Sequence, residues 1–224
     1  SYRLVLVLDV SGSMDTASAG GQVRQVNADG SITITTRLDL ARQALAQLVE
    51  EYYNQAQNVS ITLITFASSA TVVNATPYTT KDAAIAAILT ADGSGGTNYS
   101  SALSAVQTSF GTVNPAVRNA VYFISDGAPS DGDETTPATS TGYAAWVSSN
   151  DIDSYAVGVG TGIANTGPLN GIHNVDANGN GMRDPWEQAT GLASQPVPGD
   201  GGPDGDPDGD GLTVTTDRGT YTTA

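Results

Sequence analysis

The sequence has no cysteine and little positive charge, and each deficit excludes a class of site or partner. Without cysteine the chain can form neither disulfides nor thiolate zinc sites, and cysteine usage leaves its redox compartment undecided. Lys and Arg number 8 against 23 Asp and Glu, which gives a net charge of −15. A polyanion would be repelled by this charge, so we expect no nucleic-acid partner.

Long hydrophobic runs and histidine are also scarce. No apolar run approaches the roughly 20 residues of a membrane helix, so we expect no membrane insertion. The single histidine, His173, is interpreted as a surface or packing residue, and the nucleophile pattern G-x-S-x-G is absent. We therefore expect a chain that is not an enzyme, with a metal-dependent hydrolase as the remaining catalytic alternative.

Apolar runs of strand length alternate with segments of helical period. This pattern is typical of a mostly parallel sheet covered on both faces, and the length suits one domain over residues 1–224. We predict a doubly wound, Rossmann-like α/β fold with one short antiparallel edge strand, Thr71–Asn74. The other strands are predicted at Tyr2–Leu8, Val59–Phe66, Ala120–Ile124, Ser154–Val159 and Leu212–Thr216, and the helices at Arg37–Tyr53, Lys81–Leu89, Tyr99–Phe110 and Thr141–Ser149. Since the first strand starts at Tyr2, we expect the sequence to begin at a domain edge.

Two segments interrupt the alternation. In residues 15–36, the β-prone stretches Gln22–Val26 and Ser31–Thr35 flank an Asp-Gly pair, which predicts a hairpin. This hairpin is either a surface excursion or a flap beside the site described next. Residues 165–211 are rich in Gly, Asp and Pro and are interpreted as a calcium-binding insertion.

A first set of oxygen-bearing side chains follows the ends of predicted strands. Asp9, Ser11 and Ser13 form a D-x-S-x-S turn after the first strand, Thr97 lies in a Gly-rich loop, and Asp126 follows a later strand. In open α/β sheets, ligands gather at the carboxyl ends of strands where the strand order reverses. All five side chains donate oxygen, which suits Mg²⁺, with Mn²⁺ or Ca²⁺ as substitutes. Two carboxylates and three neutral hydroxyls would leave the ion electrophilic towards a partner's carboxylate, which is a chemistry of binding.

Four segments, LVLDVSGSM, RLDLARQAL, GGTNYSSAL and VYFISDG, occur in this order. In this combination the chain resembles a von Willebrand factor type A domain with a metal-ion-dependent adhesion site, over about residues 1–160 and again in the last strand. The resemblance implies a doubly wound fold, and direct metal ligation by Ser11, Ser13 and Thr97. It implies that Asp9 and Asp126 bind the ion directly or through water, and that a sixth position accepts a partner's acidic group. The hairpin and the Asp-rich insertion depart from the common core of the family.

A second set of oxygen ligands matches the calcium-loop pattern D-x-[DN]-x-[DN]-G-x₅-E in residues 176–187. Its ligands would be Asp176, Asn178, Asn180, the Met182 carbonyl, Asp184 and Glu187. Gly and Pro make the flanking segments poor helices, so we predict a lone loop of weak affinity that stabilises structure.

A third set repeats Asp at every second position. The candidate calcium ligands are Asp204, Asp206, Asp208, Asp210 and Asp217, and the alternative is a solvated acidic loop. Clustered carboxylates repel one another unless cations lie between them. Such loops in a type A domain are similar to those of large calcium-dependent bacterial adhesins, including those with repeats-in-toxin export signals.

Two functions follow from these sites. The first is an adhesion module on the outside of a bacterial cell, which captures a protein or cell-surface ligand with an acidic group and contacts neighbouring domains of a larger chain. The second is a calcium-rigidified structural spacer of a long surface protein, with an unused metal site.

Overall fold

The fold was obtained as a computed structural model of the chain. It describes residues 1–15, 24–26, 32–34, 36–127, 129, 137–160 and 167–173. The chain divides after His173 into two units, and all described residues belong to the first. The predicted last strand, Leu212–Thr216, and both predicted calcium loops lie outside the described residues.

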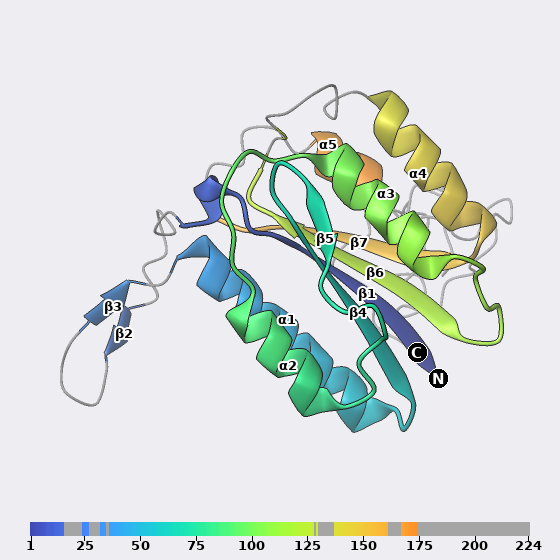
Figure 1. The fold of residues 1–224 in the computed structure, drawn as a ribbon, viewed down its shortest axis with the longest axis horizontal. Helices are drawn as coiled ribbons and strands as arrows, with labels where there is room; N and C mark the ends of the chain where they lie inside the picture. Colours follow the sequence, from blue (N-terminus) through green and yellow to red (C-terminus); the bar gives the residue numbers. More distant parts are fainter. Residues whose placement is uncertain are drawn as a thin grey trace, which may run out of the picture. The chain divides into compact units, whose positions relative to one another are not determined.

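Five strands form one sheet in the order β5-β4-β1-β6-β7 (Figure 1). The strands are β1 (Tyr2–Asp9), β4 (Val59–Phe66), β5 (Ala70–Val72), β6 (Arg118–Ser125) and β7 (Ile152–Gly158). Only the edge strand β5 pairs antiparallel among these five strands. The predicted mostly parallel sheet with one short antiparallel edge is therefore confirmed.

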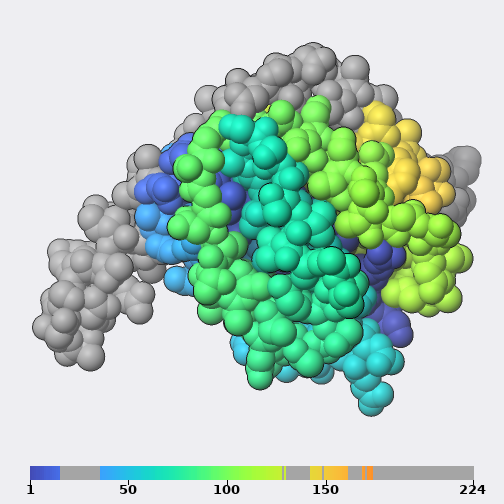
Figure 2. Space-filling model, viewed as in Figure 1, coloured from blue at the N-terminus to red at the C-terminus, as the bar shows by residue number. Residues whose placement is uncertain are grey.

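Helices cover both faces of this sheet, which confirms the doubly wound fold. They are α1 (Arg37–Gln55), α2 (Lys81–Thr90), α3 (Tyr99–Phe110), α4 (Pro137–Ser149) and α5 (Gly167–Ile172), with a 3₁₀ turn, η1, at Gly12–Asp15. Buried side chains of α1 and α2 join one core cluster, and those of α3, α4 and α5 join the other. Figure 2 shows the segment from β5 to α3, coloured teal to green, as much of the visible surface in this direction. None of the described helices is long and apolar enough to cross a membrane.

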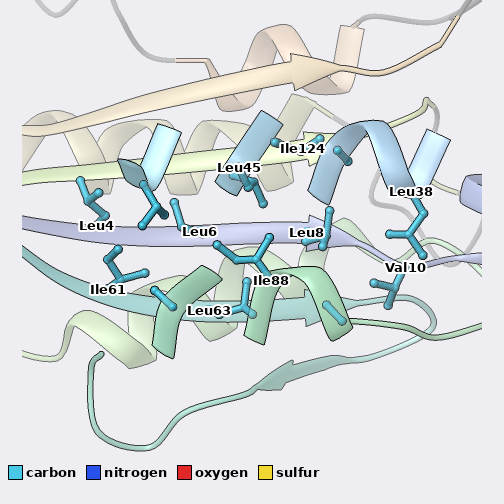
Figure 3. Close-up of a cluster of buried hydrophobic side chains, with 14 of the residues drawn as sticks. Leu4, Leu6, Leu8, Val10, Leu38, Leu45, Ile61, Leu63, Ile88 and Ile124 are labelled. Carbon is cyan, nitrogen blue, oxygen red and sulfur yellow. The ribbon is translucent and has the colours of Figure 1, made fainter. Parts of the chain in front are cut away.

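The central strand β1 is buried on both faces. Leu4, Leu6 and Leu8 point towards α1 and α2, whereas Val5 and Val7 belong to the opposite cluster (Figure 3). All five side chains are fully buried. Parallel strands buried on both faces have continuous apolar sequences, which explains why β1 is recognisable from sequence. Each such side chain contributes roughly 1.5–3 kcal/mol through burial.

The edge strand β5 ends two residues before its prediction because Asn74 makes side-chain bonds instead. The Asn74 Oδ1 accepts a hydrogen bond from the Leu63 N–H at 2.8 Å, and its Nδ2 donates to the Ile61 carbonyl at 3.0 Å. The Val73 N–H still donates to the Leu63 carbonyl at 2.8 Å. A buried amide side chain thus takes over pairing that a longer strand would supply.

Helix α5 was not predicted, and α4 begins earlier than predicted. Gly and Pro lower helix propensity in Gly167–Ile172, yet Leu169 and Ile172 are only 5% and 1% exposed. Tertiary packing of this apolar face therefore outweighs propensity. α4 starts at Pro137, four residues before the predicted start, and proline suits the first turn because its missing N–H is not needed there.

The predicted hairpin strands pair antiparallel. β2 (Arg24–Val26) and β3 (Ile32–Ile34) are in register with Val26 opposite Ile32. After them, Thr36 caps α1: its hydroxyl accepts from the Asp39 N–H at 3.1 Å, and the Asp39 carboxylate accepts from the Thr36 N–H at 3.4 Å. This reciprocal capping box sets the first residue of α1 as Arg37.

Candidate metal site

The candidate site lies where the strand order reverses. From β1 the chain builds the β4 side of the sheet and then returns to place β6 on the other side of β1. This is the position at which open α/β sheets bind ligands. Leu8 of β1 is in register with Ile124 of β6, so the residues that follow each strand emerge beside one another.

Asp9 is fully buried at this position, and both of its carboxylate oxygens are engaged. Its Oδ1 accepts from the Ser11 N–H at 2.8 Å, and its Oδ2 accepts from the Ser125 hydroxyl at 2.6 Å. Burial raises the pKa of the Asp9 carboxyl, hydrogen bonds from Ser11 and Ser125 lower it in part, and the negative charge of Asp126 raises it. A cation between the two carboxylates would offset both causes of the rise.

Ser11, Ser13 and Asp126 continue the cluster from Asp9. The hydroxyl oxygens of Ser11 and Ser13 lie 3.2 Å apart, and the Ser13 hydroxyl donates to Asp126 Oδ1 at 2.9 Å. The turn is held by the Met14 N–H, which donates to the Ser11 carbonyl at 3.0 Å, and the Met14 side chain is fully buried. The structure therefore brings four of the five predicted residues into one chain of contacts across β1 and β6.

Thr97 lies in a loop that is tied to this turn. The Gly12 N–H donates to the Gly95 carbonyl at 3.1 Å, and Gly95 has a φ of +117° that an L side chain rarely adopts. On the other side of Thr97, Asn98 accepts from the Ser101 N–H at 2.7 Å and caps α3. Thr97 itself is 6% exposed. The loop that carries the fifth predicted residue thus lies against the D-x-S-x-S turn.

Tyr99 is a site residue that sequence reasoning missed. Its hydroxyl donates to the Gly127 carbonyl, which anchors the loop after β6. Its ring packs edge-on against Phe66 and Phe123, with centroids 5.8 and 4.9 Å away. Burial raises the pKa of Tyr99, so the hydroxyl remains a donor. In the sequence it reads only as the first residue of a helix.

Arg37 is the second missed residue, and it bonds directly to a predicted ligand. Its Nη1 donates to Asp126 Oδ2 at 2.5 Å, and the two side chains are 19% and 5% exposed. Asp126 therefore accepts from Ser13 through one oxygen and from Arg37 through the other. No local spacing signals this contact, because 89 residues separate the partners.

The chemistry of the donor set fits a hard divalent cation. Carboxylate and hydroxyl oxygens suit Mg²⁺, Mn²⁺ or Ca²⁺, and neither a thiolate nor an imidazole takes part. Among the described residues, no group of three or more His, Asp or Glu side chains could hold a metal. An ion at this site would therefore depend on the hydroxyls as well as on the two carboxylates.

Comparisons with known proteins agree with this architecture. Residues 4–128 match the sequence profile of the von Willebrand factor type A domain. A search of curated proteins found no match.

Several solved structures share the fold. BatB from Bacteroides thetaiotaomicron is 21% identical, with a TM-score of 0.52 over 70% of this chain and 66% of BatB. Proximal thread matrix protein 1 (PTMP1) from the mussel byssus is 17% identical, with a TM-score of 0.58 over 79% of this chain and 42% of PTMP1. Another PTMP1 structure has zinc in its MIDAS motif, that is, its metal-ion-dependent adhesion site. It is also 17% identical, with a TM-score of 0.50 over 77% of this chain and 39% of that chain.

Proposed function

Because this chain belongs to the von Willebrand factor type A domain family, we propose that it is a metal-dependent adhesion module. In this proposal a divalent cation at the sheet's carboxyl edge is held by Asp9, Ser11, Ser13, Thr97 and Asp126. The cation then binds an acidic group of a protein or cell-surface ligand.

One observation carries the proposal. Asp9, Ser11, Ser13 and Asp126 form a continuous cluster at the reversal of strand order, although 113 residues separate Ser13 from Asp126. The side chains of these four residues supply hydroxyl and carboxylate oxygens, which are the donor set of a hard cation. PTMP1, a protein of similar fold, has a structure with zinc in its MIDAS motif, which supports a divalent cation in this position.

The charge of the chain makes the ion necessary for capture. With a net charge of −15, the protein repels an acidic ligand at long range. Hydroxyl ligands are neutral, so an ion held largely by them retains positive charge for an incoming carboxylate. We therefore expect capture to depend on the cation, whichever surface carries the acidic group.

The same proposal places the protein outside a bacterial cell, as part of a longer chain with neighbouring domains. Calcium at residues 176–187, and at the Asp-rich segment 204–217, would stabilise the C-terminal region. Loops with neutral Asn ligands suit weak calcium binding, around 10⁻⁴–10⁻³ M, in extracellular surroundings.

A structural spacer is the second candidate, and one contact favours it. Asp126 is already neutralised by Arg37, and its side chain is 5% exposed. A spacer with an unused site predicts that metal changes neither ligand capture nor the behaviour of site variants.

The adhesion proposal is tested with Thr97→Ala, with Thr90→Ala at the exposed end of α2 as the matched control. We expect Thr97→Ala to lower Mn²⁺ affinity by at least about 10-fold, because the loss of a direct ligand should cost no less than the loss of a residue that supports one. Thr90→Ala should bind Mn²⁺ like the original chain.

The same variants are then compared for capture of whole bacterial and host-cell surfaces with Mg²⁺, with Ca²⁺ alone and with chelator. Capture that requires the metal and is lost in a folded Thr97→Ala variant supports adhesion. Full capture by that variant, or capture in chelator, would overturn metal-dependent adhesion and leave the metal site unused, as the spacer hypothesis expects.

A further inference from the structure

Arg37 holds the carboxylate that the metal would need. Its Nη1 lies 2.5 Å from Asp126 Oδ2 in a pair that is largely shielded from solvent. We infer that Arg37 is a built-in counter-cation, which competes with the metal for Asp126 and thereby sets the affinity of the site. This inference rests on the proposed metal site and adds a residue that limits its occupancy.

The competition follows from the bonds that Asp126 already makes. The Ser13 hydroxyl donates to one of its oxygens and Arg37 to the other, so both oxygens are engaged without metal. A cation bound among Ser11, Ser13 and Asp126 adds a second positive charge beside the guanidinium. Two cations on one weakly solvated carboxylate repel each other, because little water lies between them to screen the charge.

The surrounding backbone holds Arg37 against this carboxylate. Gly160, after β7, has a φ of +108°, and a Cβ atom there would lie 2.7 Å from Arg37 Nε. The Arg37 side chain thus packs against the backbone at Gly160, and a side chain at that position would have to displace it. Within the described part of the chain, Arg37 Nε is buried and has no hydrogen-bond partner. The ion pair that Nη1 forms with Asp126 therefore offsets part of the free-energy cost of burying this unpaired N–H.

The other arginine of α1 is engaged elsewhere. Arg42 donates to Asp39 at 3.1 Å and lies 3.7 Å from Asp92, and its guanidinium also bonds the Ala91 carbonyl. Arg37 is therefore the cation of α1 that faces the site. The opposite role for Arg37 is to orient Asp126 for the metal, and the two roles predict changes of opposite sign.

The test compares Arg37→Gln with Lys81→Gln in the full chain. Lys81 forms an exposed pair with Glu50 at 3.4 Å, so its variant changes net charge equally without touching the site. Chelator-treated proteins are titrated with Mn²⁺ and followed by electron paramagnetic resonance. We expect Arg37→Gln to bind Mn²⁺ at least about 10-fold more tightly, since one repelling charge is removed, while Lys81→Gln binds like the original chain.

Stability supplies a second readout. Without metal, Arg37→Gln should unfold at a lower temperature than Lys81→Gln, because Asp126 has lost its counter-charge. Saturating Mn²⁺ should close this difference. Arg37→Lys, which keeps the charge, should bind Mn²⁺ more like the original chain than Arg37→Gln does.

The outcomes separate the inference from the proposed function. If the original chain binds Mn²⁺ and Arg37→Gln binds it equally or more weakly, the counter-cation role is overturned and the metal site stands. If only Arg37→Gln binds Mn²⁺, Arg37 blocks the site, and the metal-dependent function fails for the original chain. If neither binds, both proposals are overturned.

Discussion

The Ser125 hydroxyl donates a 2.6 Å hydrogen bond to Oδ2 of Asp9, and both side chains are fully buried. The bond joins the ends of β1 and β6 on the side where the candidate ligands emerge. It satisfies a buried carboxylate that would otherwise be destabilising in the absence of metal. Ser125 therefore supports the candidate site without being one of its predicted ligands.

Ser125→Ala should lower the free energy of unfolding by about 1–3 kcal/mol without metal, since Asp9 Oδ2 loses its partner inside the core. Urea denaturation in chelator measures the change. Ser60→Ala is the control on the neighbouring strand β4, because the hydrogen bond of the Ser60 hydroxyl within the described residues is a long one, 3.4 Å to the Tyr2 carbonyl. Its expected effect is below about 0.5 kcal/mol, and equal effects would contradict the role of Ser125.

Gly160→Ala should lower stability by about 1–3 kcal/mol, because an L side chain at a φ of +108° is strained and its Cβ would meet Arg37. Gly142→Ala is the matched control. Gly142 lies within α4 with open space around its Cβ position, so alanine should raise stability by about 0.5–1 kcal/mol. Thermal unfolding of both variants measures the difference, and a Gly160→Ala variant as stable as Gly142→Ala would contradict the strain and the close packing expected at Gly160.

Alkaline pH should destabilise the domain through its buried tyrosines. Burial raises the pKa of Tyr52, Tyr99, Tyr122 and Tyr143. Above pH ~10 the unfolded chain loses these protons while the folded chain keeps them. The unfolded state then binds fewer protons, so stability falls as pH rises.

Urea denaturation as a function of pH, with tyrosinate absorbance, measures this loss. Tyr122→Phe removes one of the shifted groups, together with its 2.7 Å contact to the Tyr52 hydroxyl, and should make the fall less steep. If the absorbance of the folded protein near pH ~10 rose by the amount expected for ionisation of all its tyrosines, the expectation would be contradicted.

Calcium removal should lower the melting temperature if residues 176–187 bind the ion. At calcium ten-fold above Kd, the stabilisation lost on chelation is about 1.4 kcal/mol. Asp176→Ala and Glu187→Ala should each reproduce most of this loss in calcium. Asp15→Ala, outside both loops, should not. Identical melting temperatures with and without calcium would remove the proposed stabilising role.

The fold was predictable because apolar residues follow clearly different spacings in its strands and in its helices. The continuous apolar run of β1 and the helical spacing of Leu38, Ala41 and Leu45 are local signals that tertiary packing reinforced. α5 was not predicted because its glycine and proline residues lower the helix propensity of the segment, whereas the helix forms through the burial of its apolar residues. Local propensity is a weak guide wherever burial of two apolar residues outweighs it.

The candidate site was only partly predictable for a related reason. Asp9, Ser11 and Ser13 share one turn, and Asp126 follows a recognisable strand, so the sheet alone predicts their meeting. Arg37 carries no such signal, since its contact with Asp126 depends on where a capped helix begins and on a glycine 123 positions later along the chain (160 − 37). Pairs of this kind become visible only in three dimensions.

The parallel register of β1 with β6 sets the distance between the carboxylates of Asp9, at the end of β1, and Asp126, which follows β6. Successive residues of a strand are about 3.3 Å apart, so a slip of one residue would shift one carboxylate relative to the other by more than a metal–oxygen bond length of roughly 2.0–2.6 Å. Leu8 opposite Ile124 fixes this spacing from within the buried sheet. In the proposed site, substitutions in the loops that follow β1 and β6 would change the bound ligand, whereas the spacing of the two carboxylates is set by the register of the buried strands.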